Sequence, residues 1–237
     1  MSKSGIGGID YCINPFVGCS HGCLYCYASF MKKYTGHREP WGAFVDVKTN
    51  APSLLERQLR KATSGTIVLS SVTDPYQPAE RTYRVTRRCL EVLAHSGLSV
   101  EILTKSPLIL RDADLLKTLP DVKAGLTITT DNDSVRRLFE PGAPPIEKRI
   151  KALESLRAMG ISTYAFIGPV LPMNPEMLAG MIEPHVDSIL IDRMNYPSKT
   201  VAVYRKNGFE EWLDRSFADG IVARLGKAFK GIQVELY

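Results

Sequence analysis

Short apolar runs rich in β-branched residues alternate along this 237-residue chain with amphipathic stretches of helical periodicity. This alternation is typical of successive βα units around a parallel sheet, and a sheet covered by helices needs strands that are apolar on both faces. The pattern predicts an α/β fold of about six βα units. The predicted strands are 9–13, 66–72, 99–104, 125–130, 162–170 and 188–191, with a last short strand at 232–237. The predicted helices are 51–62, a run from Val85 to Gly97, one opening at Ser106-Pro107, 145–159, one opening at Asn174-Pro175, and 208–230.

Polar residues follow several predicted strands at their C-terminal ends. Any strand has to end in polar loop residues, so one such ending carries no information. A repeated set is more informative, because the C-terminal mouth of a β/α barrel is where the chemistry takes place. The set comprises Thr73-Asp74, Thr104-Lys105, Thr129 to Asp131, Asp192-Arg193 and Asn195.

The stretch Asn14–Phe30 places three cysteines, Cys19, Cys23 and Cys26, in a C-x₃-C-x₂-C spacing. Three thiolates in one tight loop can converge on a single inorganic centre. They are one short of the four that saturate an iron–sulfur cubane, so one iron would stay open to a small molecule.

Three other interpretations of these cysteines remain open. A structural zinc site would need a further ligand such as Cys12 or His21, because such sites usually combine two separated ligand pairs. A thioredoxin-like redox pair would use Cys23 and Cys26 and leave Cys19 without a role. Three buried apolar cysteines are improbable in a glycine-containing loop of eight residues. The cluster interpretation uses all three.

Composition limits location and partners. A hydrophobic fraction of 44% and a mean hydropathy of −0.08 describe an ordinary soluble globule, and no run approaches the roughly 18 apolar residues of a membrane span. The N-terminus lacks the apolar segment of a secretory signal, and cysteines gathered in one loop suit a reducing compartment. We therefore expect a cytoplasmic protein with no membrane partner. A net charge of +5 permits nucleic-acid binding without requiring it. The oligomeric state is left open.

The cysteine motif, with an aromatic residue before its last cysteine and after the first strand of a (β/α)₆ pattern, resembles that of the radical S-adenosylmethionine (SAM) enzymes. Within that superfamily, NPFVGCSHGCLYCYA and TDPYQPAE are similar to the spore photoproduct lyase, or DNA repair photolyase-like, group. The resemblance implies a partial (β/α)₆ TIM-type barrel. It covers one radical SAM core domain over 1–237, with a cluster loop at 14–30 and a C-terminal helix and short strand at 208–237.

The resemblance also implies the cofactors and the chemistry. Cys19, Cys23 and Cys26 would hold a [4Fe–4S] cluster whose fourth iron is chelated by the amino and carboxylate groups of SAM. A reductant such as flavodoxin or ferredoxin would supply one electron. Reductive cleavage would then release a 5′-deoxyadenosyl radical, which abstracts hydrogen from a substrate.

Further residues match positions around SAM in the family. Tyr25 would lie beside the cluster and the adenine, Thr73 and Asp74 would contact the SAM amino group, and Lys105 would contact the SAM carboxylate. Each also has an ordinary structural explanation: loop packing for Tyr25, a turn cap for Asp74 and a solvated strand end for Lys105.

Weaker matches lie on the later strands. Thr129 would contact the ribose, and Pro169 would line the adenine pocket. Arg193 and Asn195 are candidates for substrate contact, unless Asp192 or Asp187 pairs with the Arg193 guanidinium instead.

One departure from the group concerns the substrate. Spore photoproduct lyases carry a hydrogen-donating cysteine near the end of the second strand, where this chain has Leu69-Ser70-Ser71-Val72. This difference argues against thymine-dimer reversal unless Cys12 or a tyrosine replaces the thiol. The expected substrate is a nucleic-acid lesion or modified base. The alternatives are a peptide or small metabolite and, outside enzymes, a zinc-binding or iron–sulfur scaffold.

Overall fold

The computed structural model describes residues 1–62 and 64–236, and within them an eight-stranded sheet runs in the order β1-β2-β5-β6-β7-β8-β9-β10. Every neighbouring pair is parallel except β1 and β2. Since β1 and β10 lie at the two edges, the described sheet is an open, partial barrel. Its strands are β1 (Ser2–Lys3), β2 (Tyr11–Ile13), β5 (Thr66–Leu69), β6 (Ser99–Thr104), β7 (Val122–Thr127), β8 (Ser162–Ile167), β9 (Ser188–Ile191) and β10 (Gln233–Leu236).

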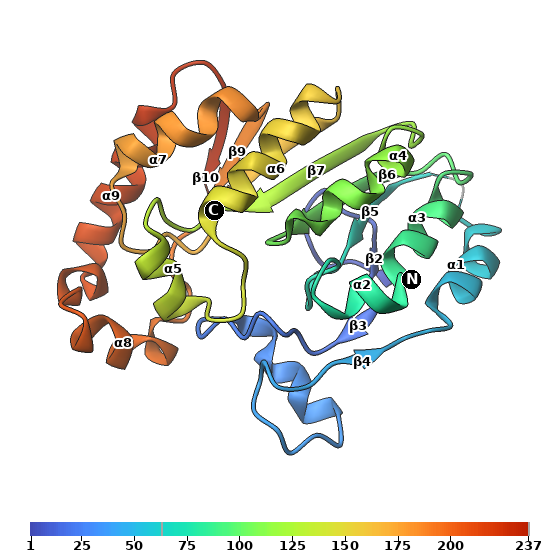
Figure 1. The fold of residues 1–237 in the computed structure, drawn as a ribbon, viewed down its shortest axis with the longest axis horizontal. Coiled ribbons are helices and arrows are strands. Elements are labelled where there is room, and N and C mark those ends of the chain that lie inside the picture. The colour runs from blue at the N-terminus through green and yellow to red at the C-terminus, as the bar shows by residue number, and fades with distance from the viewer. Residues whose placement is uncertain (63, 237) are drawn as a thin grey trace.

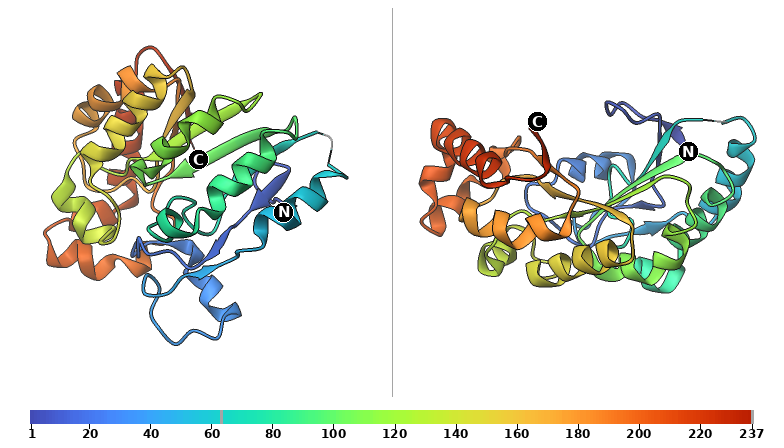
Figure 2. Two further views of the ribbon diagram at one scale, coloured as in Figure 1. Left: turned by 45° about the vertical axis from the view of Figure 1, so that its right-hand side comes forward. Right: turned by 90° about the horizontal axis from the view of Figure 1, so that it is seen from above.

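The larger helices form an arc around the outside of the curved sheet (Figures 1 and 2). Alternate strand residues such as Ile67, Ile102 and Leu126 are fully buried in the core shared with these helices. The α-helices are α1 (Ala51–Leu59), α2 (Ala79–Tyr83), α3 (Val85–Leu93), α4 (Ala113–Leu116), α5 (Asp133–Phe139), α6 (Ile146–Ala158), α7 (Pro175–Ile182), α8 (Val201–Lys206) and α9 (Arg215–Ala228). Short 3₁₀ helices are η1 (Tyr27–Tyr34), η2 (Pro107–Asp112), η3 (Glu183–His185), η4 (Pro197–Lys199) and η5 (Glu210–Leu213).

A small antiparallel ribbon carries the cysteine loop outside the main sheet. Strands β3 (Phe16–Val17) and β4 (Asp46–Val47) pair with each other, and the cysteine loop and η1 lie between them. In Figure 1 η1 and the chain that leads from it to β4 project from the body of the protein below these two strands. The cysteine loop is therefore an excursion from the barrel that lies between β2 and β5 in the chain.

On the inner face of the sheet, side chains fill the barrel interior around Gly125, and a pocket begins nearer the C-terminal ends of the strands. Gly125 pairs with Tyr164, whose phenol donates to Glu101 (3.0 Å), so the Tyr164 ring fills the space above the glycine. The next inward-facing pair toward the C-terminal mouth, two residues along each strand, is Thr127 and Phe166, and both line a pocket. The barrel interior is therefore packed below this pair and hollow above it.

The main strands lie where the sequence predicted them, but three of them end early. β5, β7 and β8 end at Leu69, Thr127 and Ile167, three residues before the predicted ends at 72, 130 and 170. The predicted helix 208–230 is interrupted, because Asp214 adopts an extended conformation and accepts a hydrogen bond from Phe217 N as the cap of α9. Gly220 does not interrupt α9. Tyr237, the end of the last predicted strand, lies outside the described residues. No helix in the described ranges has the length and apolar character needed to cross a membrane.

The close packing of Tyr164 on Gly125 predicts that adding one methyl group at this position destabilises the protein. A Cβ on Gly125 would lie 2.3 Å from Cζ of Tyr164, so Gly125→Ala should lower the free energy of unfolding by about 1–3 kcal/mol. Gly180→Ala is the matched control, since no atom lies within 4 Å of its Cβ position in α7, and it should stabilise by about 1 kcal/mol. Denaturant unfolding of both variants checks this, and equal effects would contradict the packing argument.

Candidate active site

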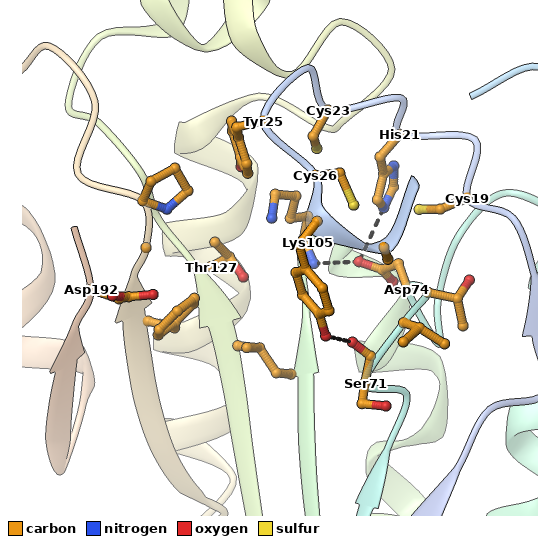
Figure 3. A pocket seen from close by; sticks show the side chains of 18 of the residues that line it. Cys19, His21, Cys23, Tyr25, Cys26, Ser71, Asp74, Lys105, Thr127 and Asp192 are labelled. Atoms are coloured by element: carbon orange, nitrogen blue, oxygen red, sulfur yellow. Dashed lines mark hydrogen bonds and ion pairs between the residues drawn. The ribbon is translucent and has the colours of Figure 1, made fainter. Parts of the chain in front are cut away.

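The cysteine loop crosses the C-terminal ends of the strands, and its three thiols point toward one pocket (Figure 3). Hydrogen bonds from Gly22 N to Cys19 O (3.2 Å) and from Cys26 N to Cys23 O (3.1 Å) close two tight turns. Gly22 has a φ of +58°, in the left-handed region that favours glycine. These turns contribute to directing the three side chains to one side.

The donor set fits a multi-iron cluster better than a single metal ion. All five cysteines are free thiols, and Cys19, Cys23 and Cys26 share the pocket. Within residues 1–62 and 64–236, no three His, Cys, Asp or Glu side chains approach closely enough to hold one metal ion. A cluster does not need that convergence, because each thiolate binds a different iron. The zinc interpretation therefore finds no support in this geometry, and a Cys23–Cys26 redox pair would leave the third pocket thiol unused.

Burial keeps these thiols protonated in the metal-free protein. It raises the pKa of all three cysteines, that of Cys23 to about 12. Cluster insertion therefore has to displace protons from the loop, as is general for thiolate ligands.

Asp74, at the end of the second βα strand, joins three parts of the site. Its Oδ1 accepts from Thr104 Oγ1 (2.6 Å) and Tyr76 N (2.8 Å), and its Oδ2 accepts from Lys105 N (2.8 Å). His21 Nε2 lies 3.1 Å from Oδ2, within ion-pair distance although the angle is not that of a hydrogen bond. Burial by itself raises the pKa of Asp74, but His21 and the hydrogen bonds outweigh it and lower the pKa to about 2. The carboxylate is therefore ionised and already surrounded by partners.

Thr73 holds the cysteine loop by its backbone. Its hydroxyl donates to Gly18 O (2.6 Å), and Gln77 Nε2 donates to the same oxygen (3.2 Å). Gln77 Oε1 accepts in turn from Ser20 N (3.0 Å). The sequence did not single out Gln77, although it lies within the TDPYQPAE motif.

Lys105 lines the pocket beneath Tyr25, with its side chain 15% exposed. Its Nζ lies 3.8 Å from Glu140 Oε1 and 5.8 Å from the centroid of the Tyr25 ring. Burial lowers the pKa of Lys105, but the negative charge of Glu140 is the largest opposing cause and the pKa is raised. A protonated ammonium therefore faces the pocket beside the cysteine loop.

The two predicted adenosine contacts differ in position. Pro169, joined to Gly168 by a cis peptide bond, lines the pocket near Phe166. Thr129 is fully buried outside the pocket lining and donates to Glu140 Oε1 (3.1 Å). Because β7 ends earlier than predicted, Thr127 occupies the pocket wall in place of Thr129.

The predicted substrate contacts lie on the loop after β9. Arg193 and Asn195 both line the pocket. Asn195 donates to both carboxylate oxygens of Asp192 (3.1 and 2.9 Å). Arg193 pairs with Asp219 of α9 (3.2 Å), so the predicted pairing with Asp192 or Asp187 is wrong. Arg193 pairs with Asp219 because α9 packs near this loop, and this tertiary contact cannot be recognised from the residues around Arg193 in the sequence.

No thiol besides those of Cys19, Cys23 and Cys26 lines this pocket in the described part of the chain. Cys12 is buried next to the wall, with Sγ 3.1 Å from Ser71 Oγ. Tyr27, at the pocket mouth, hydrogen-bonds through its phenol to the carbonyl oxygen of Ser71. Cys12 is thus separated from the pocket by one serine.

The radical SAM superfamily model matches residues 13–185, which include the cysteine loop and most of the parallel strands. This chain belongs to the radical SAM superfamily. Members use a [4Fe–4S] cluster and SAM, and the thiols and Lys105 described above suit that pair of ligands. The protein is thus a radical SAM enzyme, as the cysteine motif predicted.

Similar proteins include an archaeal and a viral relative. The uncharacterized protein MJ0683 of Methanocaldococcus jannaschii is 34% identical over 99% of this chain and 94% of its own length. The protein named Radical SAM Nalpha-GlyT isomerase, from Pseudomonas phage M6, is 31% identical over 67% of this chain and 32% of its own length. The chain spans about half the length of its mycobacterial relatives.

Among solved structures, spore photoproduct lyase complexed with a dinucleoside spore photoproduct has a TM-score of 0.71 to this fold. The sequence identity is 12%, and the match covers 100% of this chain and 79% of that one. This likeness confirms the predicted radical SAM core fold.

The loop geometry predicts which cysteines retain iron. After anaerobic reconstitution the protein should hold roughly four irons per chain, and Cys19→Ala, Cys23→Ala or Cys26→Ala should each lose most of them. Cys12→Ala and Cys89→Ala should keep wild-type iron, since Cys12 lies behind Ser71 and Cys89 is fully buried in the core. Iron and sulfide analysis with absorbance spectra checks this. A loss of iron in the Cys12 variant, or zinc in place of iron, would contradict the three-cysteine site.

Proposed function

We propose that this chain is a cytoplasmic enzyme that holds a [4Fe–4S] cluster through Cys19, Cys23 and Cys26 and abstracts hydrogen from a base of a nucleic acid. When bound, the reduced cluster and SAM supply a 5′-deoxyadenosyl radical at the pocket. A one-electron reductant such as flavodoxin or ferredoxin would complete the system. The observation that carries the proposal is the common pocket shared by the three thiols and the Lys105 ammonium.

On the SAM side, we assign the carboxylate of the methionine moiety to Lys105 and the adenine to the surfaces of Tyr25 and Pro169. Asp74 would act through its neighbours, because both of its oxygens already have partners. Thr73 would likewise act by holding the loop rather than by contacting SAM. Arg193 and Asn195 would contact the substrate on the opposite side of the pocket.

The nucleic-acid assignment rests on an exposed aromatic row that begins at the pocket mouth. Tyr27, Phe30 and Tyr34 of η1 are 45%, 42% and 77% exposed. Their rings follow one another with centroids 6.4 and 6.3 Å apart. Consecutive exposed rings offer stacking surfaces for successive unpaired bases. A strand whose target base enters the pocket could place its neighbouring bases on this row.

The charge around the row has the sign that a phosphate backbone requires. η1 carries Lys32 and Lys33 and no acidic residue. Lys199 lies at the same mouth, with Nζ 5.4 Å over the exposed ring of Tyr196 and donating to Cys26 O (2.7 Å). One solved structure of similar fold supports this substrate class, since it holds a dinucleoside spore photoproduct. A peptide or small metabolite is the alternative substrate.

The SAM assignment predicts the effect of removing one ammonium. Reconstituted protein given dithionite and SAM should release 5′-deoxyadenosine, and Lys105→Met should weaken SAM binding about tenfold or more by deleting a charge-assisted contact. Lys123→Met is the control, because Lys123 is exposed on β7 outside this pocket. Equilibrium dialysis measures the SAM affinity of each variant, and product chromatography measures the release of 5′-deoxyadenosine. Unchanged SAM affinity in Lys105→Met, or an equal loss in Lys123→Met, would contradict the assignment of Lys105.

The aromatic row predicts binding of single strands without strong sequence preference. Phe30→Ala/Tyr34→Ala should weaken binding of short labelled single-stranded DNA or RNA about tenfold or more, because each stacked base contributes roughly 1–3 kcal/mol. Tyr83→Ala removes an equally exposed ring on α2 and should have no effect. Fluorescence anisotropy at two salt concentrations measures this, since phosphate contacts weaken steeply with salt. Salt-independent or unchanged binding would favour a peptide or metabolite.

A further inference from the structure

Glu140 has a buried carboxylate beside the pocket. It belongs neither to the cysteine motif nor to the polar residues at the strand ends, so the sequence did not predict a role for it. It follows α5 directly and is fully buried. It does not line the pocket. A fully buried carboxylate is costly unless its partners compensate, so its contacts should show why the fold retains it.

Four side chains from four elements meet at this carboxylate. Oε1 accepts hydrogen bonds from the phenol of Tyr25 and from Thr129 Oγ1, and it lies 3.8 Å from Lys105 Nζ. Oε2 lies 2.5 Å from Nη2 of Arg149, a guanidinium on α6 that is also fully buried. Glu140 therefore contacts both residues that we assign to SAM at this end of the pocket, Tyr25 and Lys105.

The charges of this cluster do not cancel. One carboxylate faces two cations, and the much shorter contact is with Arg149 (2.5 Å against 3.8 Å). Arg149 is further fixed by hydrogen bonds to Thr127 O (3.0 Å) and Pro144 O (2.9 Å), so it cannot turn toward the pocket without losing them. The surplus positive charge therefore resides on Lys105, at the pocket surface.

The segment around Glu140 is also attached to the cysteine loop. Leu24 N donates to Phe139 O (2.9 Å), and Gly142 N donates to His21 O (3.0 Å). The approach at Gly142 is so close that a Cβ there would lie 2.2 Å from Ser20 O. These two main-chain contacts flank Glu140 and fix its carboxylate relative to the loop that carries the cysteines.

We propose that Glu140 is a positioning residue for SAM: without touching it, the carboxylate holds the Lys105 ammonium and the Tyr25 ring in fixed places relative to the cysteine loop. This inference rests on the proposed assignment of Lys105 to the SAM carboxylate. A simpler role would be structural, with Glu140 serving only to neutralise Arg149.

The two roles are separated by removing the ion pair as a unit. Glu140→Gln alone would leave Arg149 buried without a counter-charge and could unfold the protein. Glu140→Gln/Arg149→Met removes one charge of each sign and keeps the net charge of the cluster. The amide introduced by Glu140→Gln would retain an oxygen for Tyr25 and Thr129, so the loss of negative charge falls on Lys105. Replacing a buried pair by groups of similar volume is often close to neutral for stability.

If Glu140 positions Lys105, the reconstituted double variant should keep wild-type iron, sulfide and unfolding midpoint but bind SAM about tenfold or more weakly, as expected for a displaced charge-assisted contact. In a Lys105→Met background the same double substitution should cause no further loss, because its effect passes through Lys105. Equilibrium dialysis with SAM measures affinity without turnover.

Wild-type SAM affinity in a folded, iron-loaded double variant would overturn the positioning role. So would a further loss of affinity in the Lys105→Met background. If Lys105→Met itself binds SAM normally, the proposed SAM assignment fails first, so the two failures are distinguishable. Should the double variant not fold, Tyr25→Phe and Lys105→Met can be compared with Tyr25→Phe/Lys105→Met. If the combined variant loses less SAM affinity than the sum of the two single losses, the result supports Glu140 as their common anchor. An additive loss of SAM affinity contradicts it.

Discussion

The Asp74 carboxylate is the junction on which the candidate site depends. A carboxylate at the end of one strand accepts from the hydroxyl and from the main chain at the end of the next strand, Thr104 and Lys105, and meets His21 of the cysteine loop. These contacts link two strand ends to the cysteine loop. Charge-assisted hydrogen bonds to a buried, ionised carboxylate are stronger than neutral ones. The loop is therefore fixed to the barrel before any cluster is present.

A second buried carboxylate attaches the loop from its other side. Glu140 contacts Tyr25, which lies between Cys23 and Cys26, while Asp74 contacts His21, which lies between Cys19 and Cys23. Burial raises the pKa of both carboxyls, yet the pKa of each is held at about 2 by the partners that surround it, Arg149 and Lys105 in the case of Glu140. Both groups stay ionised across neutral pH, so the anchoring of the loop does not depend on protonation changes near pH 7.

The sequence predicted what is local or periodic, and it failed where the contact is tertiary. Three cysteines within eight residues, and polar residues at strand ends, are visible without a structure. Glu140 is not, because its contact with Tyr25 spans 115 positions and its own neighbours in sequence are ordinary for a turn. The Arg193–Asp219 pair was missed for the same reason.

Two other misses have local causes. Thr129 was preferred to Thr127 because Thr127 to Thr130 continue the apolar strand pattern, and only sheet pairing shows where β7 ends. Asp214 interrupted a helix that periodicity alone would continue, since a capping carboxylate competes with the helix interior for backbone N–H groups. The aromatic row of η1 was within reach of sequence reasoning, but exposure rather than spacing distinguishes it from a core-facing stripe.

The two sides of the pocket differ in how firmly their polar groups are held. Asp74, Glu140 and Lys105 are buried or nearly so, and each is fixed by contacts from several elements. Across the pocket, Asn195 and Tyr196 are exposed on a loop, and Arg193 keeps a half-exposed partner in Asp219. Pre-organised groups favour a ligand that is always the same, whereas loop residues can change without disturbing the barrel. This division agrees with the proposal that SAM is held on the cysteine side and that the loop after β9 contacts the substrate. Changes of substrate among related chains should therefore fall on the loop side, while the carboxylates that hold the cysteine loop stay as they are.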